Sequence, residues 1–400
     1  MKNNFLLGLA ILGMLATSCT TDDTSDIIIN DNSVVNNNNG NPIPGDECEI
    51  IPAALYSANV TLEANKCYII NGPVIMAEGT VLTINEGATI KAEATGADVY
   101  IAISQGARIV AAGTAADPIV FTSNATSPQA GDWGGLILLG RAPINSVSGT
   151  ATSTSEIASL PYGGTNAADN SGSIEYVRIE YSGGAADGSS ENNGFSFYGV
   201  GNGTVVSHIQ AFEGKDDGVE FFGGTVEVNY VSVINAQDDS IDWTEGFSGK
   251  VTNAYVKHGA DHDKGFECDG YNTDIGNNSS PLFWSKPTVT NATIVGLGSS
   301  TGNEAVRLRA GTQGIFNNIL IEGFEEGFDL DGDVGAASDN PTGTGVLNGD
   351  LSVTDVTFTD VIDNVKNDTG ETFTDADFVT GEGNGTGTDY ATWGAGWTVN

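Results

Sequence analysis

Short runs of alternating apolar and polar residues, separated by glycines, make up most of the chain after its first 47 residues. Residues 81–83 and 89–91 are two such runs, with a glycine between them. Alternation with a period of two is typical of β-strands, and these runs show no 3.6-residue period of an amphipathic helix. The 54 glycines, with abundant Thr, Asn and Val, fit many short strands joined by turns. The pattern predicts an all-β fold.

A six-residue pattern recurs through the middle of the chain. Its third residue is Gly, Ser or Ala, its fourth is Phe, Val or Ile, and the copies start at residues 192, 216, 238, 263, 303 and 325. The starts are 24, 22, 25, 40 and 22 residues apart, which fits one solenoid coil per copy and a loop insertion in the longest interval. Stretches such as "LTINEGATIKA" resemble coils of right-handed parallel β-helices. We therefore predict a right-handed, single-stranded parallel β-helix over residues 48–400.

The ends of such a solenoid need protection, because terminal coils expose unpaired backbone and core side chains. We expect the segment between Cys48 and Cys67 to cap one end and the tail with Trp393 and Trp397 to cover the other. Cys48 and Cys67 are also expected to form a disulfide, because the chain is predicted to be exported. Cys268 has no obvious partner in the sequence.

The fifth residue of each copy is expected to point outward, opposite the inward-pointing fourth. These fifth residues are Ser196, Glu220, Asp242, Glu267, Arg307 and Asp329. Equivalent residues of stacked coils lie about 4.8 Å apart, and two carboxylates at that distance repel by roughly 1 kcal/mol in water. Exposure to solvent, hydrogen bonds within turns, or a bound cation would each relieve this repulsion, and the sequence leaves these alternatives open.

Calcium is the cation that best fits such a cluster, since it takes six to eight oxygen ligands. Neither the spacing of an EF-hand nor a calcium-binding nonapeptide repeat is present, so hydrogen-bonded turn capping remains the structural alternative. The predicted calcium ligands are Asp216, Asp217, Asp238, Asp239, Asp242, Asp263, Asp329, Asp331 and Asp333.

Two of the repeats, "KDDGVEF" and "QDDSIDW", resemble the acidic motifs of polygalacturonase-type pectinases. That resemblance implies general acid–base roles for Asp217, Asp238 and Asp239. Arg307 and Arg309 resemble that family's Arg-x-Lys substrate clamp, although the lysine is absent. The coil "HGADHDKG" places His258 and His262 only near the position of the family's Gly-His-Gly motif. In lyases of the same fold a Lys or Arg is the base, a role open to Lys264, which charge neutralisation explains equally well.

Three aromatic residues, Phe221, Phe222 and Trp243, follow the outward acids of their repeats. An exposed ring beside carboxylates would suit stacking on a sugar, whereas buried rings would form part of the core. The sequence alone does not separate the two.

The N-terminus has the features of an exported lipoprotein. Residues 1–18 contain one Lys and an apolar run, too short to span a bilayer, and end before Cys19. This arrangement resembles the bacterial lipobox, which implies a lipidated Cys19 that anchors the protein in the outer membrane. Residues 19–47 are acidic and Asn-rich and are predicted to be a disordered tether. The stretch "TTDDTSD" resembles the signal that exports Bacteroidetes-type lipoproteins to the cell exterior.

The chain carries 14 Lys+Arg against 52 Asp+Glu, a formal charge of −38. Such a charge excludes nucleic acid as a partner, because phosphates would be repelled. "GDWGGLILLG" and the acidic coils resemble a group of uncharacterised Bacteroidetes surface lipoproteins. We therefore expect a surface-anchored, non-enzymatic module that binds glycan or another extracellular ligand, with Ca²⁺ as its only expected cofactor. The alternative is a polysaccharide hydrolase or lyase. Any outer-membrane protein partner stays unidentified.

Overall fold

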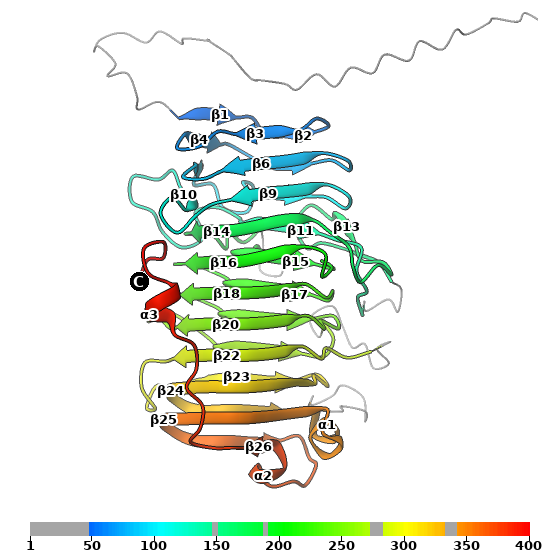
Figure 1. The fold of residues 1–400 in the computed structure, drawn as a ribbon, viewed down its shortest axis with the longest axis vertical. Coiled ribbons are helices and arrows are strands. Elements are labelled where there is room, and N and C mark those ends of the chain that lie inside the picture. The colour runs from blue at the N-terminus through cyan, green and yellow to red at the C-terminus, as the bar shows by residue number, and fades with distance from the viewer. Residues whose placement is uncertain (1–47, 146–150, 187–190, 273–282, 333–341) are drawn as a thin grey trace, which may run out of the picture.

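The computed structural model describes residues 48–145, 151–186, 191–272, 283–332 and 342–400. The predicted signal peptide, Cys19, the predicted tether and Asp333 lie outside these ranges. In the described part the chain winds through stacked coils whose parallel strands form one 24-stranded sheet, as Figure 1 shows. The predicted all-β, right-handed parallel β-helix is confirmed. None of the helices in the described ranges is long and apolar enough to cross a membrane.

One of the three sides of the solenoid carries the six-residue repeats, and we call it the acidic side. It consists of β2 (Ala54–Tyr56), β5 (Val74–Met76), β8 (Ile101–Ile103), β11 (Leu136–Leu139), β15 (Phe195–Tyr198), β17 (Val219–Phe222), β19 (Ile241–Thr244), β21 (Phe266–Asp269), β23 (Glu304–Arg309) and the second half of β24 (Gly314–Asp331). Each strand pairs with its equivalent in the next coil, as Phe195 does with Val219 and Val219 with Ile241. The fourth residues of the repeats stack inside the core, as expected.

The other two sides are separate strands in the first coils and continuous strands later. The separate strands are β3 (Val60–Leu62), β6 (Val81–Asn85) and β9 (Arg108–Ala112) on one side, and β1 (Glu49–Ile51), β4 (Cys67–Ile70), β7 (Thr89–Ala92) and β10 (Ile119–Ser123) on the other. The continuous strands that follow are β14 (Gly172–Glu180), β16 (Val205–Phe212), β18 (Glu227–Ile234), β20 (Lys250–Lys257), β22 (Thr288–Val295), the first half of β24, and β25 (Leu351–Asp368). A small hairpin of β12 (Ser153–Thr154) and β13 (Pro161–Tyr162) is inserted in the chain between β11 and β14.

The corner between these two sides is made by one residue per coil with left-handed backbone. The angle φ is 57° at Asn253, 57° at Asn291 and 59° at Asn318, a region that Asn tolerates better than most residues. Asn291 Nδ2 donates a hydrogen bond to Asn253 Oδ1 (3.1 Å), and Asn318 Nδ2 donates one to Asn291 Oδ1 (2.8 Å). The three amides form an asparagine ladder that fastens successive coils at the corner.

The aromatic residues next to the acids belong to the interior. Phe221, Phe222 and Trp243 are at most 1% exposed. Phe221 stacks on Phe197 and on Phe247, with ring centroids 5.3 and 4.3 Å apart. The alternative of sugar stacking on these rings is therefore wrong, because Phe221 and Trp243 lie in the main core and Phe222 is buried in a second apolar cluster with Tyr162 and Tyr198.

At the N-terminal end, a disulfide joins Cys48 to Cys67, as predicted, with the two Cα atoms 4.5 Å apart. Because β1 pairs with β4, the disulfide fastens the first coil to the second. The segment between the two cysteines is the first coil itself rather than a separate cap, and Ile50 and Leu55 on it are exposed.

The expectation that the Trp-rich tail covers the C-terminal end is wrong. That end is covered by α1 (Thr342–Asn348) and α2 (Asp375–Phe378), which precedes β26 (Val379–Thr380); Phe378 packs edge-on against Phe328 in the core. The tail, with α3 (Tyr390–Trp393), instead runs back along the flank of the solenoid beside β16, β18 and β20 (Figure 1). Trp397 packs edge-on against Tyr176 and His208. These two aromatic residues lie at the corner of coils in the middle of the solenoid.

We expect Asn291→Ala to lower the free energy of unfolding by about 2–3 kcal/mol. The substitution removes two hydrogen bonds of the ladder. It also leaves alanine in left-handed backbone, which alanine tolerates less well than asparagine because it has no side-chain amide to bond locally. Chemical denaturation followed by circular dichroism measures the change. Asn291→Gly is the matched control, since it loses the same bonds but tolerates positive φ, and it should cost about 1 kcal/mol less. Equal stability of all three chains would show that the ladder contributes nothing.

Candidate functional site

The fifth residues of the repeats form one continuous row along the acidic side. The register places directly over one another Ser196, Glu220, Asp242, Glu267, Arg307, Asp329 and, on β25, Lys366. The charge is negative over three consecutive coils, from Glu220 to Glu267, and alternates in sign from Arg307 onward. The predicted vertical register of the carboxyl groups is confirmed.

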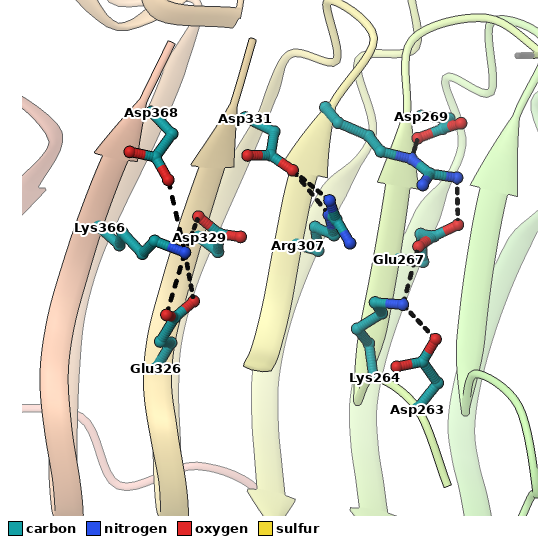
Figure 2. Close-up of polar contacts among 11 residues, drawn as sticks. Asp263, Lys264, Glu267, Asp269, Arg307, Glu326, Asp329, Asp331, Lys366 and Asp368 are labelled. Atoms are coloured by element: carbon teal, nitrogen blue, oxygen red, sulfur yellow. Dashed lines mark hydrogen bonds and ion pairs between the residues drawn. The ribbon is translucent and has the colours of Figure 1, made fainter. Parts of the chain in front are cut away.

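Ion pairs between neighbouring coils neutralise the alternating part of the row, as Figure 2 shows. Arg307 Nε donates to Asp331 Oδ2 at 2.8 Å. Arg309 spans two carboxylates, since its Nε donates to Asp269 Oδ1 at 2.6 Å and its Nη2 to Glu267 Oε2 at 2.5 Å. Both arginines of the predicted substrate clamp therefore have carboxylate partners within the protein.

Two lysines act in the same way. The ammonium group of Lys264 contacts the carboxylates of Asp263 and Glu267, the latter at 3.4 Å. Burial alone would lower the pKa of Lys264, but the surrounding carboxylates outweigh burial and raise it above its ordinary value, so the side chain stays charged. Lys366 lies within 3.7 Å of three carboxylates, those of Glu326, Asp329 and Asp368 (Figure 2).

Asp217 and Asp239, two of the three predicted catalytic aspartates, are buried and bonded to backbone. Asp217 Oδ1 accepts a hydrogen bond from the Asp239 N–H (3.0 Å), and Asp239 Oδ1 accepts one from the Lys264 N–H (2.7 Å). Each carboxylate thus caps the turn of the coil that follows it. Asp238 is adjacent but outside this chain of hydrogen bonds. All three lie on the same side of the molecule, at the start of β17 and β19.

A small hollow opens over the negative part of the row. Its volume is about 20 Å³, room for one water molecule or one metal ion. Glu220, Asp242 and Glu267 line it, together with Arg309, and the other lining residues are Glu156, Thr244, Asp269 and Asn272. Asp242 Oδ1 is buried and has no hydrogen-bond partner among the described residues. Thr244 Oγ1 shares this property, so the hollow brings carboxylate oxygens together with two unsatisfied polar atoms.

Two carboxyl groups of the row, those of Glu220 and Asp242, resist ionisation. Burial raises the pKa of Glu220 well above its ordinary value, and Asp242 and Glu156 add to the shift. Burial likewise raises the pKa of Asp242, and the charges of Glu267 and Asp269 raise it further. The coils thus hold like charges together at a cost that protonation, or a cation, would relieve.

Two further acids outside the hollow show the same effect. Burial, with the charges of Glu191 and Asp238, raises the pKa of Asp216 to about 8. Burial, with the charge of Asp331, raises the pKa of Asp329 to about 7, even though Lys366 lies nearby.

Several groups of three carboxylates have oxygens within 4.8 Å of one another and so could hold a metal ion. Among the described residues these groups include Asp217–Glu220–Asp242 and Asp239–Asp242–Glu267, which share Asp242, and also Asp216–Asp217–Asp238, Asp238–Asp239–Asp263 and Glu304–Glu326–Asp329. The two that share Asp242 fit a cation best. Both Asp242 Oδ1 and Asp329 Oδ1 are buried without a hydrogen-bond partner among the described residues, but Asp329 Oδ1 has the ammonium group of Lys366 at 3.7 Å. Of the other predicted ligands, Asp331 is paired with Arg307, and Asp333 lies outside the described residues.

Three residues near the hollow fall outside the repeat, and the sequence analysis missed them. Glu156 comes from the loop between β12 and β13 and lines the hollow. Tyr162, on β13, donates its hydroxyl hydrogen bond to Glu245 Oε2 at 2.7 Å, in a buried pair. Burial raises the pKa of Glu245 to about 7, although its bonds to Tyr162 and Asn272 act in the opposite direction. The only sign of this pair in the sequence was the position of Glu245, directly after the repeat that starts at residue 238.

We expect Glu245→Gln to flatten the pH dependence of stability. Because the folded-state pKa of Glu245 lies above its unfolded value, the wild type is favoured by protonation at low pH and loses that stabilisation as the pH rises from about 4.5 through 7. Between pH 5 and pH 8 the free energy of unfolding of the variant, relative to wild type, should therefore rise by about 3 kcal/mol. Denaturant titrations at both pH values measure the difference, and parallel pH profiles would contradict the assignment.

The comparison with known proteins places the fold in a family. The pectate-lyase-like β-helix domain family matches residues 54–398. Among curated proteins, none matches the sequence significantly. One solved structure, the A-module of mannuronan C-5 epimerase AlgE6 from Azotobacter vinelandii, is 11% identical with a TM-score of 0.28, over 79% of this chain and 90% of that one. The chain belongs to the family of pectate-lyase-like β-helix domains.

Proposed function

We propose that the protein is an extracellular binding module in which Ca²⁺, held by the acidic row at Glu220, Asp242 and Glu267, bridges to a glycan. The observation that carries the proposal is the unsatisfied, buried Asp242 Oδ1 in a hollow lined by carboxylates. Carboxylate oxygens are the ligands that Ca²⁺ prefers, and a bound dication would relieve the repulsion that raises the pKa of Asp242.

The glycan follows from the coordination chemistry of the ion. Bound through one oxygen each, the five carboxylates that line the hollow supply fewer than the six to eight oxygens that Ca²⁺ takes, which leaves positions for oxygens of a ligand. Hydroxyl or carboxylate oxygens of a sugar chain have the required chemistry. With a formal charge of −38, the protein would repel an acidic polysaccharide unless a cation lay between the two.

Binding without cleavage fits the arrangement better than catalysis. Asp217 and Asp239 are engaged by backbone N–H groups, and Arg309 is tied to Glu267 and Asp269. A hollow of about 20 Å³ accepts an ion but no sugar ring. Polysaccharide cleavage is the second candidate, favoured by the pKa of about 8 at Asp216, since a carboxyl that stays protonated near neutral pH is suited to general acid catalysis.

The location we propose is the outer face of the outer membrane, with a lipid on Cys19 as the anchor and residues 19–47 as the tether. The apolar run before Cys19 and the acidic residues after it support this location. The anchor would hold the solenoid at the cell surface, where a glycan-binding row is useful.

Asp242→Asn should weaken calcium binding by about tenfold or more, because even outer-sphere partners of a metal are worth about 10–100-fold in affinity. Isothermal titration of the purified chain with Ca²⁺ measures the affinity, and the wild-type melting temperature should rise with added Ca²⁺. The matched control is Asp117→Asn, the same charge change at an exposed loop residue before β10, which should leave binding intact.

Assays of the wild type, Asp242→Asn and a further variant, Asp239→Asn, distinguish glycan binding from glycan cleavage. Glycan arrays with and without EDTA should show retention by the wild type in Ca²⁺ only, and no retention by Asp242→Asn. Calcium affinity equal in wild type and Asp242→Asn would contradict the proposed site. Release of reducing or unsaturated ends from polysaccharides by the wild type, abolished by Asp239→Asn, would replace the binding function with the enzymatic one.

Cys19→Ser should leave the protein unlipidated and release it from the membrane fraction. Metabolic labelling with a radioactive fatty acid, with fractionation of the cells, measures both effects. Labelling of the Cys19→Ser chain would show that the anchor lies elsewhere, and protection of the wild type from protease added to intact cells would place it on the inner face.

A further inference from the structure

A pair of histidines lies at the turn between β20 and β21, apart from the acidic row. His258 directly follows β20, and His262 lies four residues later, just before the repeat that starts at Asp263. The two imidazole rings are 4.3 Å apart between centroids and tilted by 44°. Phe324 packs edge-on against His258 at 5.1 Å and so holds that ring in place.

The polar atoms of His262 are unsatisfied. His258 is 2% exposed and interacts with the Lys264 backbone, whereas neither ring nitrogen of His262 has a hydrogen-bond partner among the described residues. Buried polar atoms in folded proteins are nearly always paired, so the two unpaired nitrogens of His262, beside a second imidazole, point to a ligand. Burial, and then the neighbouring His262, lowers the pKa of His258 to about 3, although the Lys264 backbone and Asp263 act in the opposite direction, so the ring is neutral.

The third histidine of the chain shows what a structural histidine looks like here. His208 Nδ1 is 2.8 Å from Ser207 Oγ, and its ring is stacked between Tyr176 and Tyr230 at 4.2 and 4.3 Å. Its ring is thus fixed by stacking and a hydrogen bond, whereas neither ring nitrogen of His262 is hydrogen-bonded to any part of the chain that the structure describes.

We propose that His258 and His262 together bind a divalent first-row transition metal ion of the Zn²⁺ or Ni²⁺ class. Two imidazoles that share such an ion at metal–nitrogen distances of about 2.0–2.1 Å have ring centres about 4.5–5 Å apart. The observed 4.3 Å reaches that range with a small rotation of His262, the more exposed ring. Asp263, which follows His262 in the chain and whose charge acts on the His258 ring, is a carboxylate beside the pair, and water would supply the remaining ligands.

This site is chemically distinct from the acidic row and independent of the proposed function. Imidazole nitrogen favours Zn²⁺, Ni²⁺ and Cu²⁺, while the row offers only carboxylate oxygens, which favour Ca²⁺. The two sites belong to different parts of neighbouring coils, since the histidines sit in the turn before β21 and Glu267 lies on β21 itself.

Titration of the full chain, purified without a polyhistidine tag, with Zn²⁺ in the presence of excess Ca²⁺ tests the site. We expect saturable binding of one Zn²⁺ per chain, and replacement of Zn²⁺ by Co²⁺ should give visible d–d absorption bands typical of nitrogen ligation. His262→Gln should abolish both signals. This residue is only partly buried, so the variant should fold, which its circular dichroism spectrum will verify.

Two controls separate this inference from its neighbours. His208→Gln should keep Zn²⁺ binding, and Asp242→Asn should keep it while losing Ca²⁺ affinity. Wild-type chain that binds no Zn²⁺ saturably, or His262→Gln that binds it with wild-type affinity, overturns the histidine site. Loss of Zn²⁺ binding in Asp242→Asn would assign the metal to the acidic row and overturn it too.

Discussion

The vertical register of the coils is the constraint on which the rest of the structure depends. Parallel hydrogen bonding places each side chain directly over its equivalent in the next coil, about 4.8 Å away. A residue type whose side chains attract one another therefore stabilises every coil in which it recurs, as the hydrogen bonds of the asparagine ladder through Asn291 and the stacking of Phe197 on Phe221 show. A charged residue repeated in the same position is penalised by the same geometry, and the acidic row is the case in point.

The chain relieves that penalty in one half of the row and not in the other. From Arg307 to Lys366 the signs alternate, and each cation is bonded to carboxylates of adjacent coils. In the half from Glu220 to Glu267, Glu267 is bonded to Arg309 and Lys264, but Glu220 and Asp242 form no ion pair among the described residues, and burial raises the pKa of both. A sequence selected only for stability could have continued the alternation. The unrelieved stretch is therefore the part of the row most plainly suited to an external cation.

Whatever repeats from coil to coil could be predicted from the sequence, and whatever depends on a unique loop or tail could not. The period of two and the spacing of the six copies sufficed to place Glu220 over Asp242 and Asp242 over Glu267, because one register determines them all. The docking of Trp397 on Tyr176, and of Tyr162 on Glu245, joins segments about 80 or more residues apart through contacts made only once. Sequence periodicity carries no information on such contacts, so the tail was assigned to the wrong place and the Tyr162–Glu245 pair was missed.

The C-terminal tail joins the coils that carry the acidic row. In a solenoid each coil contacts only its neighbours, so repulsion between adjacent coils is opposed only locally. The β12–β13 hairpin, whose Tyr162 bonds to Glu245, and the tail both bridge coils that are not neighbours in the described chain. Arg178 on β14 donates to the Trp397 carbonyl, Gln210 on β16 bonds to the Val399 backbone, and Thr293 on β22 accepts from the Thr388 N–H. These contacts span the coils that contain β15 to β21, which are the coils with the unrelieved carboxylates. By joining β14, β16 and β22, the tail opposes separation of the coils that repulsion between these carboxylates favours, and so helps to keep the carboxylates close together.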